Sequence, residues 1–288
     1  MPVESILEHA DPALVMAHAP GENFPVALRV LPRHLQGHLK AIYGYARLTD
    51  NLGDEYPGDR SAALDWVEAQ LDALFADNPS HPVFQELAPT VSRFGLSRAP
   101  FDGLLAANRL DQHRKTHANW EELMEYCELS ANPVGRLVLA VFESATPDRL
   151  AASDAVCSGL QVLEHLQDIG EDARAGRIYL PGNDMERFGC TPEDLLAPVA
   201  GPTLRRLVEY QAHRARGMLK RGRWLVESLQ GYARLAIAGF VAGGLAGLDA
   251  VEAARFEILG QTRKAGSVRL LRRYVPLYLK AVIPPRGS

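Results

Sequence analysis

Hydrophobic residues recur at intervals of three and four along most of this chain, and that spacing restricts the folds it can adopt. Such a repeat gathers them on one side of an α-helix. Runs with hydrophobic residues at every second position between turn signals, which would predict β-strands, are absent from the sequence. We therefore predict an all-α protein of roughly ten helices. The clearest helical spacing lies in residues 63–75, 101–110, 121–127, 134–142, 151–166, 203–229 and 232–248.

The composition of the chain further limits the classes of protein to which it can belong. Of the 288 residues, 47% are hydrophobic, which is enough for a large buried core. No Gly/Ser-rich linker, repeat or low-complexity tract divides the chain, so we expect a single domain over residues 1–288. The net charge of -4 gives no basic footprint, and nucleic acid is not an expected partner. Three widely spaced cysteines match no metal-ligand spacing and predict idle thiols in a reducing compartment.

Three stretches bear on localisation. Residues 1–8 are too acidic and too weakly hydrophobic for a signal peptide. The longest hydrophobic run, residues 235–248, is shorter than the roughly 20 residues of a spanning helix, so we expect a buried core helix. We therefore expect a cytoplasmic protein. Basic residues within 263–273 could attract anionic lipid headgroups, which leaves peripheral membrane contact open, although we favour a solvated amphipathic helix.

Two short acidic segments carry most of the chemical information. Asp50 and Asp54 stand four residues apart in the first, and Asp168 and Asp172 do so in the second. On a helix this spacing puts both carboxylates on one side, one turn apart. Two such pairs facing each other across a cavity would suit Mg²⁺, which usually binds one or two carboxylates plus water and substrate phosphates. The pattern indicates diphosphate chemistry.

The neighbouring residues distinguish these pairs from ordinary surface charge. Arg47 and Tyr43 extend the first pair along the same side of the predicted helix, and Glu164 or His165 extends the second. Polar stripes beside leucines suit the lining of a cavity better than a solvated surface. Magnesium prefers oxygen, so His165 is left out of the predicted ligand set. The segment 113–117 is interpreted as a solvated turn.

Four segments together resemble the squalene/phytoene synthase family, the head-to-head branch of the isoprenoid synthases. They are residues 22–26, 43–55, 126–136 and 161–181, and the similarity extends from about Glu22 to about Tyr274. The motifs Asn-Phe-Pro-Val and Ser-Ala-Asn-Pro-Val-Gly-Arg further resemble the bacterial hopanoid-pathway subgroup. Members of that subgroup convert presqualene diphosphate into hydroxysqualene.

This resemblance implies a terpenoid synthase bundle around a central apolar cavity, with two or three Mg²⁺ ions held on the substrate diphosphate at its mouth. It implies metal-ligand or near-ligand positions at Asp50, Asp54, Glu164, Asp168 and Asp172. It implies catalytic positions beside the leaving group at Tyr43, Arg47 and Tyr179. It implies substrate contacts at Asn23, Phe24, Arg47, Tyr126, Ala131, Gly135 and Arg177.

Two positions depart from the family pattern. Asn51 replaces an aspartate that the family often has after the first one, while Asp50 and Asp54 are retained. Glu164 stands where the family usually has an asparagine in the metal site. Glutamate can still bind Mg²⁺, but it adds a negative charge and a methylene group, which could change the metal affinity or the reaction.

Three functions compete. The resemblance favours Mg²⁺-dependent conversion of presqualene diphosphate to hydroxysqualene with release of diphosphate, for which NADPH is not expected. The alternative is a prenyltransferase that condenses two farnesyl or geranylgeranyl diphosphates head to head, because both reactions use the same acidic segments. A non-catalytic assembly factor is disfavoured, since all four aspartates are present.

The expected partners follow from the substrate. We expect an isoprenoid diphosphate, other enzymes of the same pathway, and peripheral contact with the membrane from which a lipid-like substrate would arrive. The sequence does not predict the oligomeric state.

Overall fold

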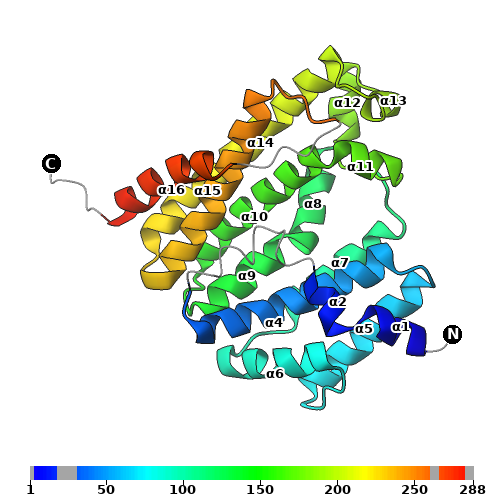
Figure 1. Ribbon diagram of the computed structural model, residues 1–288, viewed down its shortest axis with the longest axis vertical. Helices are drawn as coiled ribbons and strands as arrows, with labels where there is room; N and C mark the ends of the chain where they lie inside the picture. The colour runs from blue at the N-terminus through cyan, green and yellow to red at the C-terminus, as the bar shows by residue number, and fades with distance from the viewer. Residues whose placement is uncertain (1–2, 18–30, 260–265, 283–288) are drawn as a thin grey trace. The chain divides into compact units, whose positions relative to one another are not determined.

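Helices form most of the computed structural model, which describes residues 3–17, 31–259 and 266–282 (Figure 1). Apart from an isolated bridge between Thr116 and Ile178, the described residues contain no β-structure, so the all-α prediction is confirmed. Ten described helices have ten or more residues: α4 (Arg33–Asp50), α5 (Arg60–Phe75), α6 (Pro82–Phe94), α7 (Ala99–Asp111), α8 (Trp120–Ser130), α9 (Asn132–Val141), α10 (Pro147–Gln167), α14 (Pro202–Ser228), α15 (Gly231–Ala253) and α16 (Ser267–Val282).

Shorter helical elements join these ten. They are α1 (Val3–His9), α2 (Pro12–Ala17), the π-helical turn η2 (Asn51–Glu55), α11 (Ile169–Arg174), α12 (Gly182–Phe188) and α13 (Pro192–Leu195). Helical periodicity could not identify them, because a stretch of four to seven residues contains fewer than two turns.

The chain forms two compact units. Unit 1 comprises residues 1–114 and 129–145, and unit 2 comprises residues 115–128 and 146–288. Our expectation of one domain over residues 1–288 stays a prediction.

Unit 1 is organised around α4, which packs against α6, α7 and α9. Tyr45 of α4 is fully buried, and its ring meets those of Phe84 and Phe101 edge to face. Burial raises the pKa of the Tyr45 hydroxyl, which therefore stays protonated and donates a 2.9 Å hydrogen bond to the Phe101 carbonyl. These contacts fix the position of α4, and Asp50 is the last residue of that helix.

Unit 2 is built from α10, α14 and α15, which pack against one another. Gly222 of α14 lies where the helices approach closely. A Cβ atom added there would lie 2.5 Å from Val241 Cγ2 on α15 and 2.8 Å from Val156 Cγ2 on α10. The absence of a side chain at Gly222 therefore sets the spacing of all three helices.

The hydrophobic run 235–248 lies in α15, as expected for a core helix. Among the described residues α15 is the one helix long and apolar enough to cross a membrane, judged by length and composition alone. Of its most hydrophobic part, 61% is buried inside the structure. Its side chains pack against α10, α14 and α16, so we interpret it as the core helix that the sequence predicts.

The three cysteines all lie within the described residues and form no disulfide, and Cys127 and Cys190 are buried. Burial raises the pKa of the Cys127 thiol to about 12 and that of Cys190 to about 11. Both therefore stay protonated near neutral pH, as expected for thiols that take no part in chemistry.

Replacing Gly222 with alanine should lower the free energy of unfolding by about 1–3 kcal/mol, the usual cost of overpacking a core. The β-branched Val241 and Val156 have little freedom to move away from the new methyl group. Urea denaturation measures the change.

Gly217→Ala is the matched control on the same helix, because no atom lies within 4 Å of the Cβ that it adds. It should leave stability unchanged or raise it by up to about 1 kcal/mol, since alanine favours helix over glycine. Equal stability of the two variants would contradict close packing at Gly222.

Candidate functional site

The first acidic pair lies where α4 changes into a wider turn. Asp50 ends α4, and Asp54 belongs to the π-helical turn η2. The N–H of Tyr56 donates to the carbonyl of Asn51, five residues earlier, at 3.0 Å. A π-turn holds more residues than an α-turn, so Asp54 still follows Asp50 by about one turn. The predicted spacing is retained, but in a different kind of helix.

A side chain of α7 holds Asp50 in place. The amide nitrogen of Asn108 donates to Asp50 Oδ1 at 2.9 Å and to the carbonyl of Leu104 at 3.1 Å. Gln112 donates to the carbonyl of Gly53 at 3.0 Å, so the turn itself is tied to the same region. Asn108 is buried, and a buried amide placed against a carboxylate orients that carboxylate.

Gly53 makes this contact possible. A Cβ atom at this position would lie 2.3 Å from Asn108 Oδ1 and 3.0 Å from its Cγ. Sequence reasoning missed Asn108. The available signal was a polar residue directly after the leucines and alanines of residues 104–107, a pattern compatible with a buried hydrogen-bonding role.

Tyr43 and Arg47 precede Asp50 on α4, as predicted. Tyr43 is buried, and Arg47 is largely covered. An Nη atom of Arg47 donates to Glu55 Oε1 at 3.1 Å, and the Glu55 side chain is 59% exposed. An ion pair with such an exposed partner contributes little energy.

The second acidic pair lies at a break between two helices. α10 ends at Gln167, Asp168 has φ -108° and ψ 10°, and α11 begins at Ile169. The N–H of Asp168 donates to the Glu164 carbonyl at 3.0 Å, and the N–H of Asp172 donates to the Asp168 carbonyl at 2.8 Å. These bonds keep the three acidic residues one turn apart across the break. Glu164 is exposed, whereas Asp168 and Asp172 are half-buried.

Arg177 and Tyr179 follow this pair in a short extended segment. The N–H of Arg177 donates to the Asp172 carbonyl at 2.8 Å, and the N–H of Ile178 donates to the Lys115 carbonyl at 2.8 Å. The N–H of Gly182 donates to the carbonyl of His117 at 2.9 Å. The extended segment is thus attached along residues 115–117, which positions the ring of Tyr179.

Aromatic rings surround Tyr179. It stacks on His165 with 3.8 Å between ring centroids and an interplanar angle of 12°. Its centroid lies 5.5 Å from that of Tyr126 and 5.7 Å from that of His117. Tyr126 and Tyr179, which the resemblance assigned separate roles, therefore belong to one cluster. His117 is buried, so the interpretation of 113–117 as a solvated turn is wrong for this residue and holds for the exposed His113.

The imidazole of His165 is neutral. Burial lowers its pKa to about 3, with smaller contributions from His117 and the positive charge of Arg177. The amide of Gln161 lies 3.2 Å from His165 Nε2 and can donate to it. His165 thus serves as a flat neutral neighbour of Tyr179.

The remaining predicted residues divide between the units and the undescribed part of the chain. Ala131 precedes α9, and both it and Gly135 are buried in unit 1. Asn23 and Phe24, with the motif 22–26, lie outside the described residues. The structure therefore assembles the predicted residues as two groups. Unit 1 holds Tyr43, Arg47, Asp50, Asp54, Ala131 and Gly135; unit 2 holds Tyr126, Glu164, Asp168, Asp172, Arg177 and Tyr179.

The donor atoms of the two groups are of the kind that Mg²⁺ prefers. Within the described ranges, no three His, Cys, Asp or Glu side chains are placed to hold one metal ion. Magnesium usually takes only one or two protein carboxylates and completes its octahedron with water and phosphate oxygens. The acidic residues of each group fit that mode of binding.

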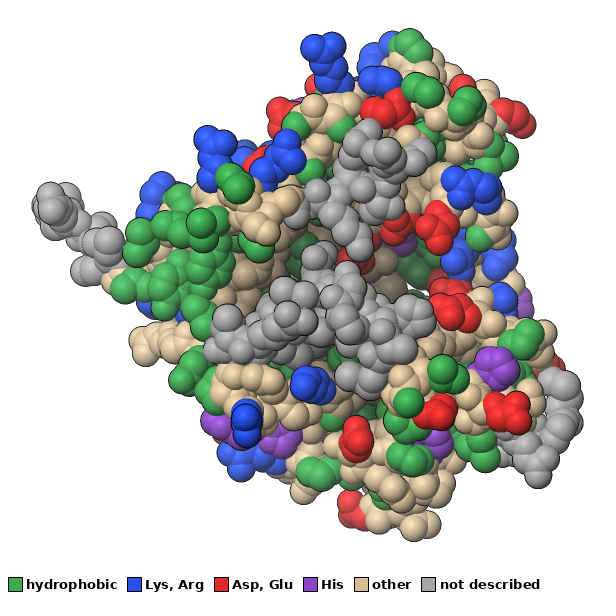
Figure 2. Space-filling model, in the orientation of Figure 1, with side chains coloured by type: hydrophobic (Ala, Val, Ile, Leu, Met, Phe, Trp, Pro, Cys, Tyr) green, Lys and Arg blue, Asp and Glu red, His purple; other side chains and the backbone are tan. Residues whose placement is uncertain are grey.

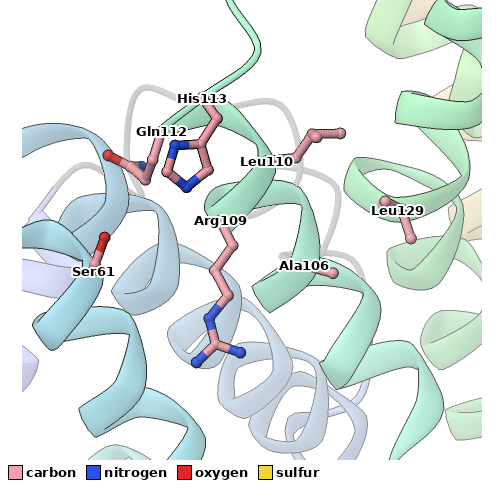
Figure 3. A pocket seen from close by; sticks show the side chains of 7 residues that line it. All are labelled: Ser61, Ala106, Arg109, Leu110, Gln112, His113 and Leu129. Carbon is pink, nitrogen blue, oxygen red and sulfur yellow. The ribbon is translucent and has the colours of Figure 1, made fainter.

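A hollow of about 420 Å³ in unit 1 is lined by none of the predicted site residues. It lies beside α7 and is lined by Ser61, Ala106, Arg109, Leu110, Gln112, His113 and Leu129 (Figure 3). The Arg109 side chain points away from His113 (Figure 3). It pairs with Asp65 at 2.6 Å and with Glu68 at 2.8 Å. Two carboxylates already balance the charge of Arg109, so we assign no ligand to this hollow.

Gly53→Ala should destabilise unit 1 by about 1–3 kcal/mol, because the new methyl group and the Asn108 amide cannot occupy the same space. In an Asn108→Ala background the same substitution should cost much less, since the obstructing amide is gone. A double-mutant cycle measured by chemical denaturation gives the coupling energy. An equal loss in both backgrounds would show that Asn108 is not the obstacle.

Comparison with known proteins identifies the family of this chain. The family model for squalene/phytoene synthases matches residues 17–273. A hydroxysqualene synthase from Zymomonas mobilis is 36% identical over 203 residues, which cover 69% of this chain and 68% of that protein. A phytoene synthase from Arthrospira platensis is 34% identical over 210 residues, which cover 68% of each chain.

Solved structures show the same likeness. The squalene synthase HpnC from Alicyclobacillus acidocaldarius matches with a TM-score of 0.79 and 38% identity, over 89% of this chain and 97% of that one. A dehydrosqualene synthase in complex with a ligand matches with a TM-score of 0.84 and 26% identity, over 96% of this chain and 99% of that one. The protein therefore has the all-α terpenoid synthase fold and belongs to the squalene/phytoene synthase family.

Proposed function

We propose that this enzyme of isoprenoid biosynthesis converts presqualene diphosphate to hydroxysqualene and diphosphate in a Mg²⁺-dependent reaction. Relatives named hydroxysqualene synthase, from Zymomonas mobilis and from Rhodopseudomonas palustris, are 36% and 33% identical to it. The observation that carries the proposal is the presence of four aspartates in two pairs, each with one-turn backbone spacing, at the end of α4 and at the end of α10.

Cleavage of the bond between carbon and the diphosphate oxygen separates charge. The bonding electron pair leaves with the diphosphate, and an allylic or cyclopropylcarbinyl-type cation remains. When bound, Mg²⁺ would neutralise the departing oxygens as their charge develops. The residues proposed to hold it are Asp50, Asp54, Glu164, Asp168 and Asp172.

Two arginines complete the proposed diphosphate site. Arg47 donates to the exposed Glu55, and phosphate oxygens could replace that weak pair at little cost. A guanidinium can bind two such oxygens at once. Arg177 lies shortly after the second acidic group, and its N–H donates to the Asp172 carbonyl. Tyr43 and Tyr179 would lie beside the leaving group, and Asn23 would contact it.

The cation that remains needs a dry, electron-rich surrounding. Aromatic faces stabilise a cation by about 0.5–2 kcal/mol each, a role proposed for Tyr126, Tyr179 and Phe24. Because burial keeps the His165 imidazole neutral, the ring stacked on Tyr179 does not repel a positive charge. Ala131 and Gly135 have small side chains that would leave room for the hydrocarbon.

Capture by one water molecule completes the proposed reaction. The water oxygen forms the new bond to carbon, and its extra proton is released. No hydride is transferred, so the reaction needs no NADPH.

The alternative is a prenyltransferase that condenses two farnesyl or geranylgeranyl diphosphates head to head. It is favoured by the 34% identity to a phytoene synthase. Both reactions break a bond to diphosphate with the same acidic residues, so only the products distinguish them.

Mass spectrometry of the products tests the proposal. Presqualene diphosphate with Mg²⁺ and no NADPH should give hydroxysqualene, and farnesyl diphosphate alone should give no C30 product. Formation of a C30 or C40 diphosphate or hydrocarbon from farnesyl or geranylgeranyl diphosphate, with presqualene diphosphate left unconverted, would establish the alternative instead.

Asp168→Asn should lower kcat/KM by about 100-fold or more, the scale seen when one preorganised charge-stabilising group is removed. Chelation of Mg²⁺ should abolish turnover of the unmodified protein, and added Mg²⁺ should restore it. Steady-state kinetics measures both effects.

Glu125→Gln is the matched control, because it removes one exposed carboxylate from a similarly spaced acidic pair on α8. It should leave kcat/KM unchanged. Full activity of Asp168→Asn with normal folding would refute the metal-binding role of the second acidic group.

A further inference from the structure

The helix α16 lies on α15 and α14 but leaves most of its surface uncovered. None of its side chains is buried. Arg273 pairs with Asp249 of α15 at 2.6 Å, and the hydroxyl of Tyr274 lies 3.5 Å from the Leu235 carbonyl. These contacts attach the helix to unit 2 along one side and leave two other sides open.

One open side is a hydrophobic stripe. Its members follow one another at intervals of three, four, four and three residues, as required for one face of an α-helix. They are Val268, Leu271, Val275, Leu279 and Val282, with exposed fractions of 73%, 61%, 40%, 47% and 47%. Six of the twelve large hydrophobic side chains exposed in the described residues belong to α16. Figure 2 shows hydrophobic side chains gathered over this helix, with Lys and Arg side chains at their margin.

The other open side is basic. Arg269, Arg272 and Lys280 fall on it, spaced by three and eight residues, so they form a row beside the hydrophobic stripe. None of the three pairs with a carboxylate in the part of the chain that the structure describes. Residues 267–282 include no Asp or Glu, although the whole chain has a net charge of -4. The local charge of α16 is therefore opposite to that of the protein.

A solvated amphipathic helix explains the basic row but not the stripe. A helix that only faces water would carry polar residues at these five positions, because exposed hydrophobic surface is unfavourable. A second copy of the chain would cover the stripe, but two such helices packed antiparallel through it would bring their basic rows together. The stripe and the basic row together instead match an anionic lipid membrane, which is hydrophobic inside and negatively charged at its surface.

We propose that α16 is an interfacial helix that docks the protein on membranes containing anionic lipids. The hydrophobic stripe enters the boundary between headgroups and acyl chains, while Arg269, Arg272 and Lys280 contact lipid phosphates. The proposal does not depend on which diphosphate reaction the enzyme catalyses.

Sedimentation with vesicles tests this docking on the full-length protein. The protein should bind vesicles of phosphatidylglycerol and phosphatidylcholine at least tenfold more tightly than vesicles of phosphatidylcholine alone. High salt should weaken the binding, because the basic row acts through screened charge. Equal binding to the two compositions, or no binding to either, would overturn the proposal.

Substitutions separate the two open sides of α16. Arg269→Gln with Arg272→Gln should reduce binding to the anionic vesicles by about 25-fold, because each basic residue near such a surface contributes about fivefold. Leu271→Ser with Leu279→Ser should reduce it at least tenfold. All four side chains are exposed, so the variants should keep the wild-type melting temperature.

Arg33→Gln with Arg206→Gln is the matched control, since it removes two exposed arginines from other helices. It should bind as the unmodified protein does. Equal losses in the control and in the Arg269/Arg272 variant would show that net charge alone drives binding and would overturn the proposal. A wild-type dimer that Leu271→Ser with Leu279→Ser converts to a monomer, without vesicle binding, would assign the stripe to a second copy and overturn it as well.

Discussion

Carboxylates one helical turn apart repel each other, and each unit of this protein is arranged to hold such a pair. In unit 1 the buried amide of Asn108 donates to Asp50. In unit 2, backbone hydrogen bonds join Asp168 to Glu164 and Asp172 to Asp168, so that the three residues lie one turn apart. Like charges held at this spacing raise the energy of the free protein unless a cation binds them. In the proposed chemistry, Mg²⁺ bound by these carboxylates would hold the diphosphate.

Both pairs also lie where a regular α-helix stops. η2 is a π-helical turn, and Asp168 separates α10 from α11. Changes of helix type are frequent at functional sites because they reorient side chains and free backbone groups. The surrounding helices are regular and closely packed, as at Gly222 and Tyr45. Irregular turns at the acidic residues are thus supported by rigid neighbours.

The sequence was informative wherever a pattern repeats. Hydrophobic spacing located seven of the ten long helices, and the i, i+4 aspartates with Arg47 and Tyr43 located one acidic group on α4. What it could not supply depends on contacts between distant residues. Asn108 is 58 positions from Asp50, and the burial of His117 follows from its pairing with the segment around Tyr179. The wider turn at Asn51–Glu55 changes the hydrogen-bond register without changing the residue types, so periodicity alone did not indicate it.

A crystal structure with Mn²⁺ and a non-reactive diphosphate analogue, analysed by anomalous scattering, tests the central claim most directly. Our account predicts manganese sites bound by carboxylates of both groups, Asp50 or Asp54 in one and Asp168 or Asp172 in the other, all contacting one diphosphate. Metal bound by only one group, or diphosphate bound away from both, would contradict it.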